Sequence, residues 1–285
     1  MSQARLMDGT SLARRILAET GERAAGLTER TGTAPCLATV LVGEDPASVT
    51  YVRMKQNRCR TAGITSRHVA LPATTTTEEL VGTLQALSTD PGVHGILLQH
   101  PVGGHIDERA AFEAIAPHKD VDGVTFASFA TMSFGLPGFV SCTPGGIMRL
   151  LDEHGVDPAG RRAVVVGRSA ILGKPVGMLL LARDATVTYC HSRTRDLSAA
   201  VREADIVVAA VGRPRLIRGQ DVKPGAVVID AGYNAGNVGD VDFDSAVQRA
   251  SLITPVPGGV GPMTIATLLE QTVDAAARQL GVAGV

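Results

Sequence analysis

The chain has 285 residues, a formal net charge of −1 at pH 7 and 45% hydrophobic residues. This length predicts one large domain or, more readily, two, and the near-neutral charge disfavours a broad nucleic-acid-binding surface. There is no membrane-length apolar run and no signal-peptide layout over the first eight residues, and the four widely spaced cysteines lack a Cys-x-x-Cys pair, which indicates a reducing cytosol without structural zinc.

The first half of the chain alternates strand-like and helix-like segments. A β-rich run over 36–42 precedes a turn and a helix expected over 47–62, which Gly63 should end. The same reading predicts strands over 64–71 and 95–99 and helices over 77–87 and 107–116. This βαβαβ order predicts a parallel sheet with right-handed crossovers.

A second α/β series begins after Cys142-Thr143-Pro144, beyond the Gly-Leu-Pro-Gly segment at 135–138. Its expected strands cover 163–167, 186–190, 205–211 and 226–230, and its expected helices cover 147–154, 174–183 and 264–280. The chain is therefore predicted to form two α/β domains, the C-terminal one a Rossmann-like parallel sheet.

A glycine-containing turn after the strand at 163–167 favours nucleotide binding. Gly167-Arg168-Ser169 leads to Gly173, and a strand, a tight turn and a helix together place phosphate on helix-terminal N–H groups. The spacing differs from G-x-G-x-x-G, so an ordinary βα turn stays open as an alternative. Ser192 and Arg193 follow the next strand, where hydroxyl and cationic groups suit the 2′-phosphate of NADP. A solvated surface is the alternative for Arg193.

Candidate catalytic side chains cluster in the first half. Ser48, Tyr51 and Lys55 share one face of the helix over 47–62, where a ring can stack on a flat ligand and an amine can transfer protons. A surface helix with a snorkelling lysine is the alternative. Only four of the 27 basic residues are lysines, which directs attention to Lys55 and Lys119 as titratable amines. Gln99 follows a buried strand, where ligands of parallel sheets bind.

Two further segments suggest a ligand site. Asp120 and Asp122 flank a valine, and they could anchor a ligand or form a structural turn. No carboxylate or histidine set with metal-ligand spacing accompanies them, so no metal is expected. Half of the residues over 253–264 are proline or glycine, which prescribes the path of the loop and lets a ligand approach its backbone. Pro262 fits the first turn of the helix that follows, and a rigid connector is the alternative.

Taken together, these segments resemble the bifunctional methylenetetrahydrofolate dehydrogenase/methenyltetrahydrofolate cyclohydrolase family, in order and over nearly the whole chain. The matching residues are Gly43 to Ser48 with Tyr51, Val52 and Lys55; Gly95 to Gln99; Lys119 to Gly123; Cys142 to Gly146; Gly167 to Ser169 with Gly173 to Pro175; Cys190 to Ser192; Val222 to Ala226; and Ile253 to Thr264.

The resemblance implies a role for each candidate residue. Tyr51 would stack on the pterin, Lys55 would transfer protons in the cyclohydrolase step, Gln99 would position Lys55, and Asp122 would grip the pterin. Further implied folate contacts are Ser48, Pro257, Gly258, Gly259 and Pro262, and implied NADP contacts are Gly167, Arg168, Ser169, Gly173, Ser192, Arg193 and Tyr233.

The resemblance also implies the organisation and activity of the chain. Residues 1–140, with a C-terminal helix over about 264–285, would form the folate-binding catalytic domain, residues 141–263 the NADP-binding domain, and a cleft would separate them. The expected protein is a cytoplasmic homodimer joined through its NADP-binding domains. It would oxidise methylenetetrahydrofolate with NADP⁺ and hydrolyse the product to 10-formyltetrahydrofolate, in one-carbon metabolism and purine biosynthesis.

Several positions depart from the family pattern. After the strand, His100 replaces a leucine and Gly103 replaces a proline. The segment 124–129 lacks the usual His-Pro-x-Asn-x-Gly, and Tyr233 replaces an isoleucine. A dehydrogenase of the same fold acting on another substrate, such as a shikimate-type enzyme, is one alternative, and a non-catalytic ligand-binding module is another. The presence of Lys55, Gln99 and Asp122 together favours an active folate enzyme.

Overall fold

The computed structural model describes residues 3–44 and 46–282, and the side chains of residues 46–51 lie outside this description. The chain divides into two compact units. The N-terminal unit comprises Arg15–Thr131, Pro137–Val140 and the residues from Ile265 onward; the C-terminal unit comprises the residues up to Arg14, Met132–Leu136 and Ser141–Thr264. Residues 3–14 therefore group with the C-terminal unit, whereas the sequence assigned them to the other domain. The expected cleft between the domains stays a prediction.

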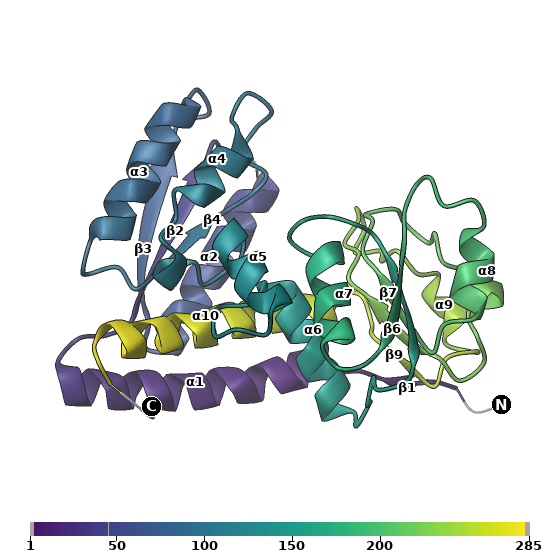
Figure 1. Cartoon of the computed structure of the whole chain (residues 1–285). Helices are drawn as coiled ribbons and strands as arrows, with labels where there is room; N and C mark the ends of the chain where they lie inside the picture. The colour runs from purple at the N-terminus through teal and green to yellow at the C-terminus, as the bar shows by residue number, and fades with distance from the viewer. Residues whose placement is uncertain (1–2, 45, 283–285) are drawn as a thin grey trace. The chain divides into compact units, whose positions relative to one another are not determined.

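A three-stranded parallel sheet organises the N-terminal unit (Figure 1). Its order is β3-β2-β4, with β2 (Cys36–Val42) between β3 (Thr65–Leu71) and β4 (Gly95–Leu98). The helices are α2 (Pro46–Thr61), α3 (Thr77–Thr89), α4 (Glu108–Glu113) and α5 (Phe126–Ser133), with a 3₁₀ turn over Pro117–Lys119. Every residue of β2 and β4 is buried, as expected for parallel strands covered on both faces. The predicted parallel sheet is confirmed.

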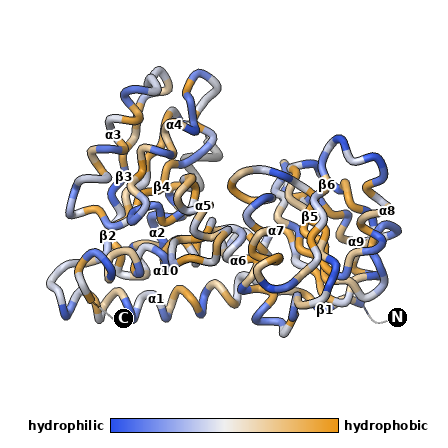
Figure 2. Tube along the Cα trace, viewed as in Figure 1, coloured by the Kyte–Doolittle hydropathy of each residue, from blue (hydrophilic) through white to orange (hydrophobic). Residues whose placement is uncertain are grey.

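Two long helices lie side by side in this unit. Within it, α1 (Gly9–Thr31) runs along α10 (Val260–Gln279), as Figures 1 and 2 show. Arg23 forms ion pairs with Asp274 and, at 3.8 Å, with Glu270, while Leu27 packs against alanines of α10. No helix was predicted over 9–31, although its buried side chains recur at the spacing of one helix face: Leu12, Ile16, Thr20, Ala24 and Leu27.

The C-terminal unit contains a six-stranded parallel sheet. Its order is β1-β9-β8-β7-β5-β6. The strands are β1 (Arg5–Leu6), β5 (Arg162–Val166), β6 (Thr186–Cys190), β7 (Ile206–Ala209), β8 (Val227–Asp230) and β9 (Leu252–Ile253). The remaining elements are α6 (Cys142–Glu153), α7 (Gly173–Leu181), α8 (Leu197–Arg202), α9 (Phe243–Ala246) and a 3₁₀ turn over Gly219–Asp221. Apolar strands occupy its centre (Figure 2), which confirms the expected Rossmann-like sheet.

The element bounds differ from the prediction in a few places. The helix α6 begins at Cys142, five residues before the predicted start at 147. The short elements α5, α8 and β9 were not predicted, because segments of two to eight residues carry too few turns of periodicity to be recognised. Among the described residues, none of the helices is long and apolar enough to cross a membrane.

Candidate active site

A buried lysine and a glutamine meet at the carboxyl edge of the three-stranded sheet. Lys55, on α2, is 9% exposed, and its Nζ donates a hydrogen bond to Gln99 Oε1 at 3.0 Å. The backbone N–H of Gln99 donates to Val40 O, and its Nε2 donates to His100 O at 3.0 Å. Because both ends of the amide are occupied, the orientation of Gln99 is set, and its oxygen is aimed at the amine. The structure thus brings together two residues predicted from separate segments.

The helical positions of Ser48 and Tyr51 agree with one shared face of α2, but their side chains lie outside the described residues. One turn beyond Lys55, Cys59 is 1% exposed. Burial raises the pKa of the Cys59 thiol to about 12. A thiol with such a pKa holds its proton at neutral pH, which disfavours Cys59 as a nucleophile.

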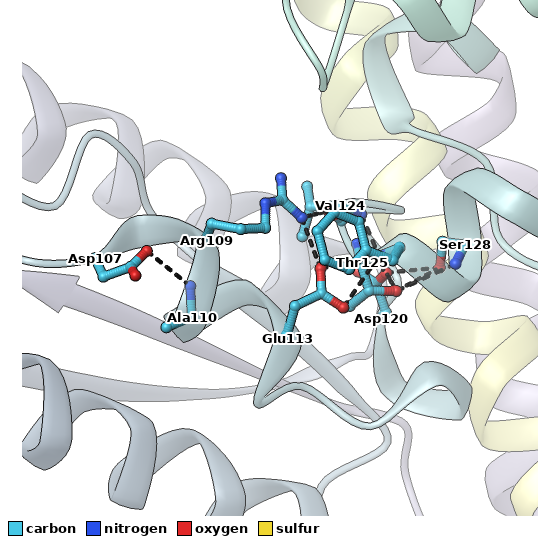
Figure 3. A network of polar contacts seen from close by, with 9 residues as sticks. Asp107, Arg109, Ala110, Glu113, Asp120, Val124, Thr125 and Ser128 are labelled. Atoms are coloured by element: carbon cyan, nitrogen blue, oxygen red, sulfur yellow. Dashed lines mark hydrogen bonds and ion pairs between the residues drawn. The ribbon is translucent and has the colours of Figure 1, made fainter.

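The two neighbouring aspartates after β4 have different environments. Asp120 is fully buried and accepts hydrogen bonds from Val124 N, Thr125 N, Thr125 Oγ1 and Ser128 Oγ, the last at 2.6 Å (Figure 3). These donors lie at the start of α5, so the Asp120 carboxylate caps the N-terminus of that helix. Asp122 is half-buried. The structure therefore assigns the Asp120 carboxylate to the start of α5, and the ligand role of Asp122 stays a prediction.

Lys119 has a structural environment. It is 3% exposed, and its Nζ donates to Asp90 O at 2.6 Å and to Leu87 O at 3.3 Å. Burial lowers the pKa of Lys119, against a smaller opposing effect of Asp90. Because these carbonyls belong to the last turn of α3 and its cap, the amine stabilises the helix C-terminus. The suggestion that Lys119 serves as a reactive amine is not supported by these contacts.

The departures from the family pattern at His100 and at 124–129 meet in one cluster. The His100 ring lies edge-on to Phe112, with centroids 6.2 Å apart. The Arg109 guanidinium stacks on Phe112 and on Phe126. It also donates to Val124 O at 2.8 Å (Figure 3). Arg109 thus joins the segment 124–129, through Phe126 and the Val124 carbonyl, to Phe112, and His100 packs onto the same Phe112 ring.

The proline- and glycine-rich loop has a packing role in the C-terminal unit. Gly258, at φ +105°, accepts hydrogen bonds at its carbonyl from Thr10 N and Thr10 Oγ1. A Cβ on Gly9 would lie 1.8 Å from Gly259 O, so the start of α1 needs glycine for this close approach. Pro262 stands in the first turn of α10, as predicted. Pro257 is exposed.

The turn between β5 and α7 has no room for a side chain at either Gly167 or Gly173. A Cβ on Gly167, at φ +140°, would lie 2.3 Å from Ala210 O, and a Cβ on Gly173 would lie 2.6 Å from the Gly167 backbone. Ser169 Oγ accepts the Gly173 N–H at 3.1 Å, while Arg168 and Ser169 are exposed. A bare, tightly folded backbone at a helix N-terminus is the cradle that a pyrophosphate requires.

Exposed polar side chains follow the neighbouring strands. Ser192 and Arg193 are exposed after β6, in a turn where the Arg193 N–H donates to His191 Nδ1 at 3.1 Å. Tyr233, after β8, is 57% exposed, and its hydroxyl donates to Asn237 Oδ1 at 2.7 Å. Every predicted dinucleotide contact therefore lies at the carboxyl ends of β5, β6 or β8. In the described part of the chain no group of His, Cys, Asp or Glu side chains is placed to hold a metal ion.

Two family models match the chain. The tetrahydrofolate dehydrogenase/cyclohydrolase catalytic domain matches residues 7–122, and the NAD(P)-binding domain of the same enzymes matches residues 141–280. The chain belongs to this family of tetrahydrofolate dehydrogenase/cyclohydrolases. The resemblance inferred from the sequence is confirmed.

Relatives with known names and structures agree with this membership. The bifunctional protein FolD 1 of Streptomyces avermitilis is 80% identical over 279 residues, covering 98% of this chain and 97% of the relative. The bifunctional FolD enzyme of Campylobacter jejuni superposes with a TM-score of 0.94 at 43% identity, covering 96% of this chain and 99% of that one. The FolD of Trypanosoma brucei, solved with NADP and an inhibitor, superposes with a TM-score of 0.94 at 40% identity, covering 98% of this chain and 99% of that one.

The chain is accordingly an enzyme of the bifunctional dehydrogenase/cyclohydrolase type. This excludes the shikimate-type and non-catalytic interpretations. Two buried carboxylates at the carboxyl edge of the six-stranded sheet, Asp230 and Asp240, were missed from the sequence. A signal for them existed in Gly239-Asp240-Val241, where a glycine beside an acidic residue marks a close backbone approach.

Proposed function

We propose that Lys55 is the proton-transfer residue of an enzyme that oxidises methylenetetrahydrofolate with NADP⁺ and hydrolyses the methenyl product to 10-formyltetrahydrofolate. The observation that carries this assignment is the 3.0 Å hydrogen bond from Lys55 Nζ to Gln99 Oε1, made by a side chain that is 9% exposed. A buried amine held in one position beside a strand end is suited to general acid–base catalysis. Gln99 acts through Lys55 as a positioning residue.

Hydrolysis of the methenyl cation requires proton movements that one amine can serve. Water adds to the methenyl carbon and loses a proton to the neutral Lys55 amine. As the carbonyl forms, the second water proton leaves, the bond from this carbon to the folate N5 breaks, and N5 keeps the electron pair and takes a proton. One proton is released to solvent in total. An amine placed by Gln99 can accept and return protons at each stage.

Substrate positioning falls to residues near this amine. We assign stacking on the pterin to Tyr51, with Ser48 on the same helix face, and hydrogen bonding to the pterin to Asp122. Support for Asp122 comes from its half-buried position two residues after the buried Asp120, in the segment that follows β4 and Gln99. Further folate contacts are assigned to Pro257, Gly258, Gly259 and Pro262. The folate nitrogens themselves stabilise the methenyl cation, so alignment is the main task of the protein.

The carboxyl edge of the six-stranded sheet suits NADP. When bound, NADP⁺ supplies the hydride acceptor for the dehydrogenase step. The tight Gly167–Gly173 turn would hold the pyrophosphate on backbone N–H groups, with Arg168 and Ser169 beside it. The exposed Ser192 and Arg193 follow β6, where they can pair with a 2′-phosphate. The Tyr233 segment after β8 completes the contacts.

The organisation of the whole protein is proposed on the same basis. Residues 1–140, with the C-terminal helix from about 264, would bind folate, and residues 141–263 would bind NADP. We infer a homodimer joined through the NADP-binding domain, because β6 is an edge strand of its sheet and the neighbouring Leu181 is 55% exposed. The four cysteines are free thiols, which suits a cytoplasmic enzyme.

The assignment of Lys55 is tested by Lys55→Met. Hydrolysis of methenyltetrahydrofolate, followed by absorbance without NADP⁺, should fall by about 10²–10⁴-fold, the usual contribution of a general acid–base residue. Methylenetetrahydrofolate with NADP⁺ should still yield some NADPH, and methenyltetrahydrofolate should then accumulate, because alignment for hydride transfer does not need the amine.

The matched control is Lys223→Met, which removes an equal side chain whose ion pair with Asp205 lies in the C-terminal unit. It should retain both activities. Full hydrolysis by Lys55→Met would refute the role of this lysine, and a wild-type enzyme that forms no NADPH would refute the dehydrogenase assignment.

A further inference from the structure

A buried carboxylate organises the loop after β7. Asp240 is fully buried, and its Oδ2 accepts the N–H groups of Val211 at 2.6 Å and Gly212 at 2.9 Å, while Oδ1 accepts the Arg213 N–H at 2.8 Å. The Asn234 side-chain amide also donates to Oδ1, at 3.0 Å. Three consecutive backbone donors on one carboxylate form charge-assisted hydrogen bonds that set the path of the loop.

A second buried carboxylate fixes the backbone that carries the first. Asp230, the last residue of β8, accepts the N–H groups of Asp240 at 2.9 Å and Val241 at 2.8 Å, and that of Gly232 at 2.9 Å. There is no space for adjustment, because a Cβ on Gly232 would lie 2.2 Å from Asp240 Cγ and a Cβ on Gly239 would lie 1.9 Å from Asp230 Oδ2. The two aspartates therefore hold the loops after β7 and β8 in one arrangement.

This arrangement adjoins the glycine turn assigned to the pyrophosphate. Ala209 of β7 is paired with Asp230 of β8, so both loops leave the same edge of the sheet. Ala210, which directly precedes the loop held by Asp240, contacts Gly167 so closely that a Cβ there would lie 2.3 Å from Ala210 O. Gly212 and Arg213 are exposed at this edge, where dinucleotides bind in parallel sheets.

We propose that Asp240 is a positioning residue for the cofactor: it holds the backbone of residues 211–213 in the shape that the bound dinucleotide contacts, without touching the dinucleotide itself. The inference rests on the proposed NADP function of this unit. Its consequence is specific, because hydrolysis of methenyltetrahydrofolate needs no dinucleotide. Loss of the Asp240 carboxylate should impair the dehydrogenase reaction through NADP⁺ and leave the cyclohydrolase reaction intact.

The test is Asp240→Asn in the full-length enzyme, with three readouts. The side-chain amide would place an N–H donor against backbone donors, so the loop must rearrange. We expect the KM for NADP⁺ to rise about tenfold, the loss of one charge-assisted hydrogen bond. NADPH binding measured by its fluorescence should weaken by the same factor, and the rate of methenyltetrahydrofolate hydrolysis without NADP⁺ should stay within about twofold of wild type.

The control is Asp205→Asn, a carboxylate of the same domain that accepts the Arg162 N–H at the opposite end of the strands. It should leave the KM for NADP⁺ unchanged. A folded Asp240→Asn enzyme with wild-type hydrolysis and an unchanged KM for NADP⁺ would overturn the proposal.

A second variant decides the matter if Asp240→Asn fails to fold. Gly212→Ala keeps the carboxylate and adds a Cβ into open space, but it strains a residue whose φ is +64°. A raised KM for NADP⁺ with normal hydrolysis would support the role of the loop, and an unchanged KM would overturn it. NADPH formation by the wild-type enzyme is measured before any variant. If the wild type forms no NADPH, the proposed dehydrogenase function is refuted, and this inference is refuted with it.

Discussion

The carboxyl edges of the two sheets are built by opposite means. At the three-stranded sheet, two polar side chains meet, because the Lys55 amine donates to the Gln99 amide oxygen at 3.0 Å. At the six-stranded sheet, the turn after β5 is closely packed backbone with glycines, and the carboxylates that hold the neighbouring loops, Asp230 and Asp240, are buried. Acid–base chemistry needs an amine of defined position, whereas phosphate recognition needs N–H groups and close approach. The difference shows that one enzyme can place its chemistry in side chains at one edge and in backbone at the other.

The largest effect that would sharpen this contrast is expected from Gly173→Ala. The new Cβ would lie 2.6 Å from the backbone of Gly167, and such overpacking costs about 2–3 kcal/mol, roughly a 30- to 150-fold loss of NADP affinity. NADPH formation at varied NADP⁺ measures it, and methenyltetrahydrofolate hydrolysis should persist. Gly82→Ala on α3, where a Cβ meets open space, is the control. Unchanged NADP⁺ kinetics in Gly173→Ala would refute the backbone cradle.

An intermediate effect is expected at the other edge from Gln99→Leu. Without the amide oxygen, the Lys55 amine loses its fixed position, and the kcat of hydrolysis should fall about tenfold, the upper end of the usual value of one hydrogen bond. The KM for NADP⁺ should not move. Gln85→Leu, an exposed glutamine of α3, provides the comparison. Parallel losses in hydrolysis and in the KM for NADP⁺ would contradict the separation of the two edges.

The smallest effect concerns the pH dependence of stability. Burial raises the pKa of Asp230 to about 6, with the charge of Asp240 acting in the same direction. The native state therefore holds this proton more tightly than the unfolded state, and the stabilising contribution is full below the ordinary pKa of 3.8 and lost as pH rises through 6.

Between pH 7 and pH 5, the wild type should gain about 1 kcal/mol of unfolding free energy relative to Asp230→Asn, which urea denaturation at both pH values measures. Asp205→Asn should show no such change in this window, because hydrogen bonding to Lys223 lowers the pKa of Asp205 and moves its titration to more acidic pH. Equal pH slopes for wild type and Asp230→Asn would show that Asp230 does not titrate there.

Two strands were predictable in their bounds. The strand Cys36–Val42 is a continuous buried run, as expected for a central parallel strand. The edge strand Thr186–Cys190 is rich in β-branched and aromatic residues, although only its last residue is fully buried. The helix α5 is short, and it also lacks a recognisable N-cap in the sequence. Its N-terminus is capped by Asp120, six positions before its first residue, rather than by an adjacent residue. The helix α1 was missed although its apolar spacing was readable.

The sequence by itself determined the family, the two α/β domains and the segments that carry the candidate site residues. It could do so because the family's motifs occur in order along the chain. Only the tertiary structure decided which partner each buried charged residue meets. Lys55 and Lys119 are both buried lysines, yet one meets a glutamine side chain and the other meets helix carbonyls. The carboxylates of Asp120 and Asp240 accept hydrogen bonds from backbone N–H groups. The physical reason is that these partners are brought together by folding and have no fixed separation in the sequence.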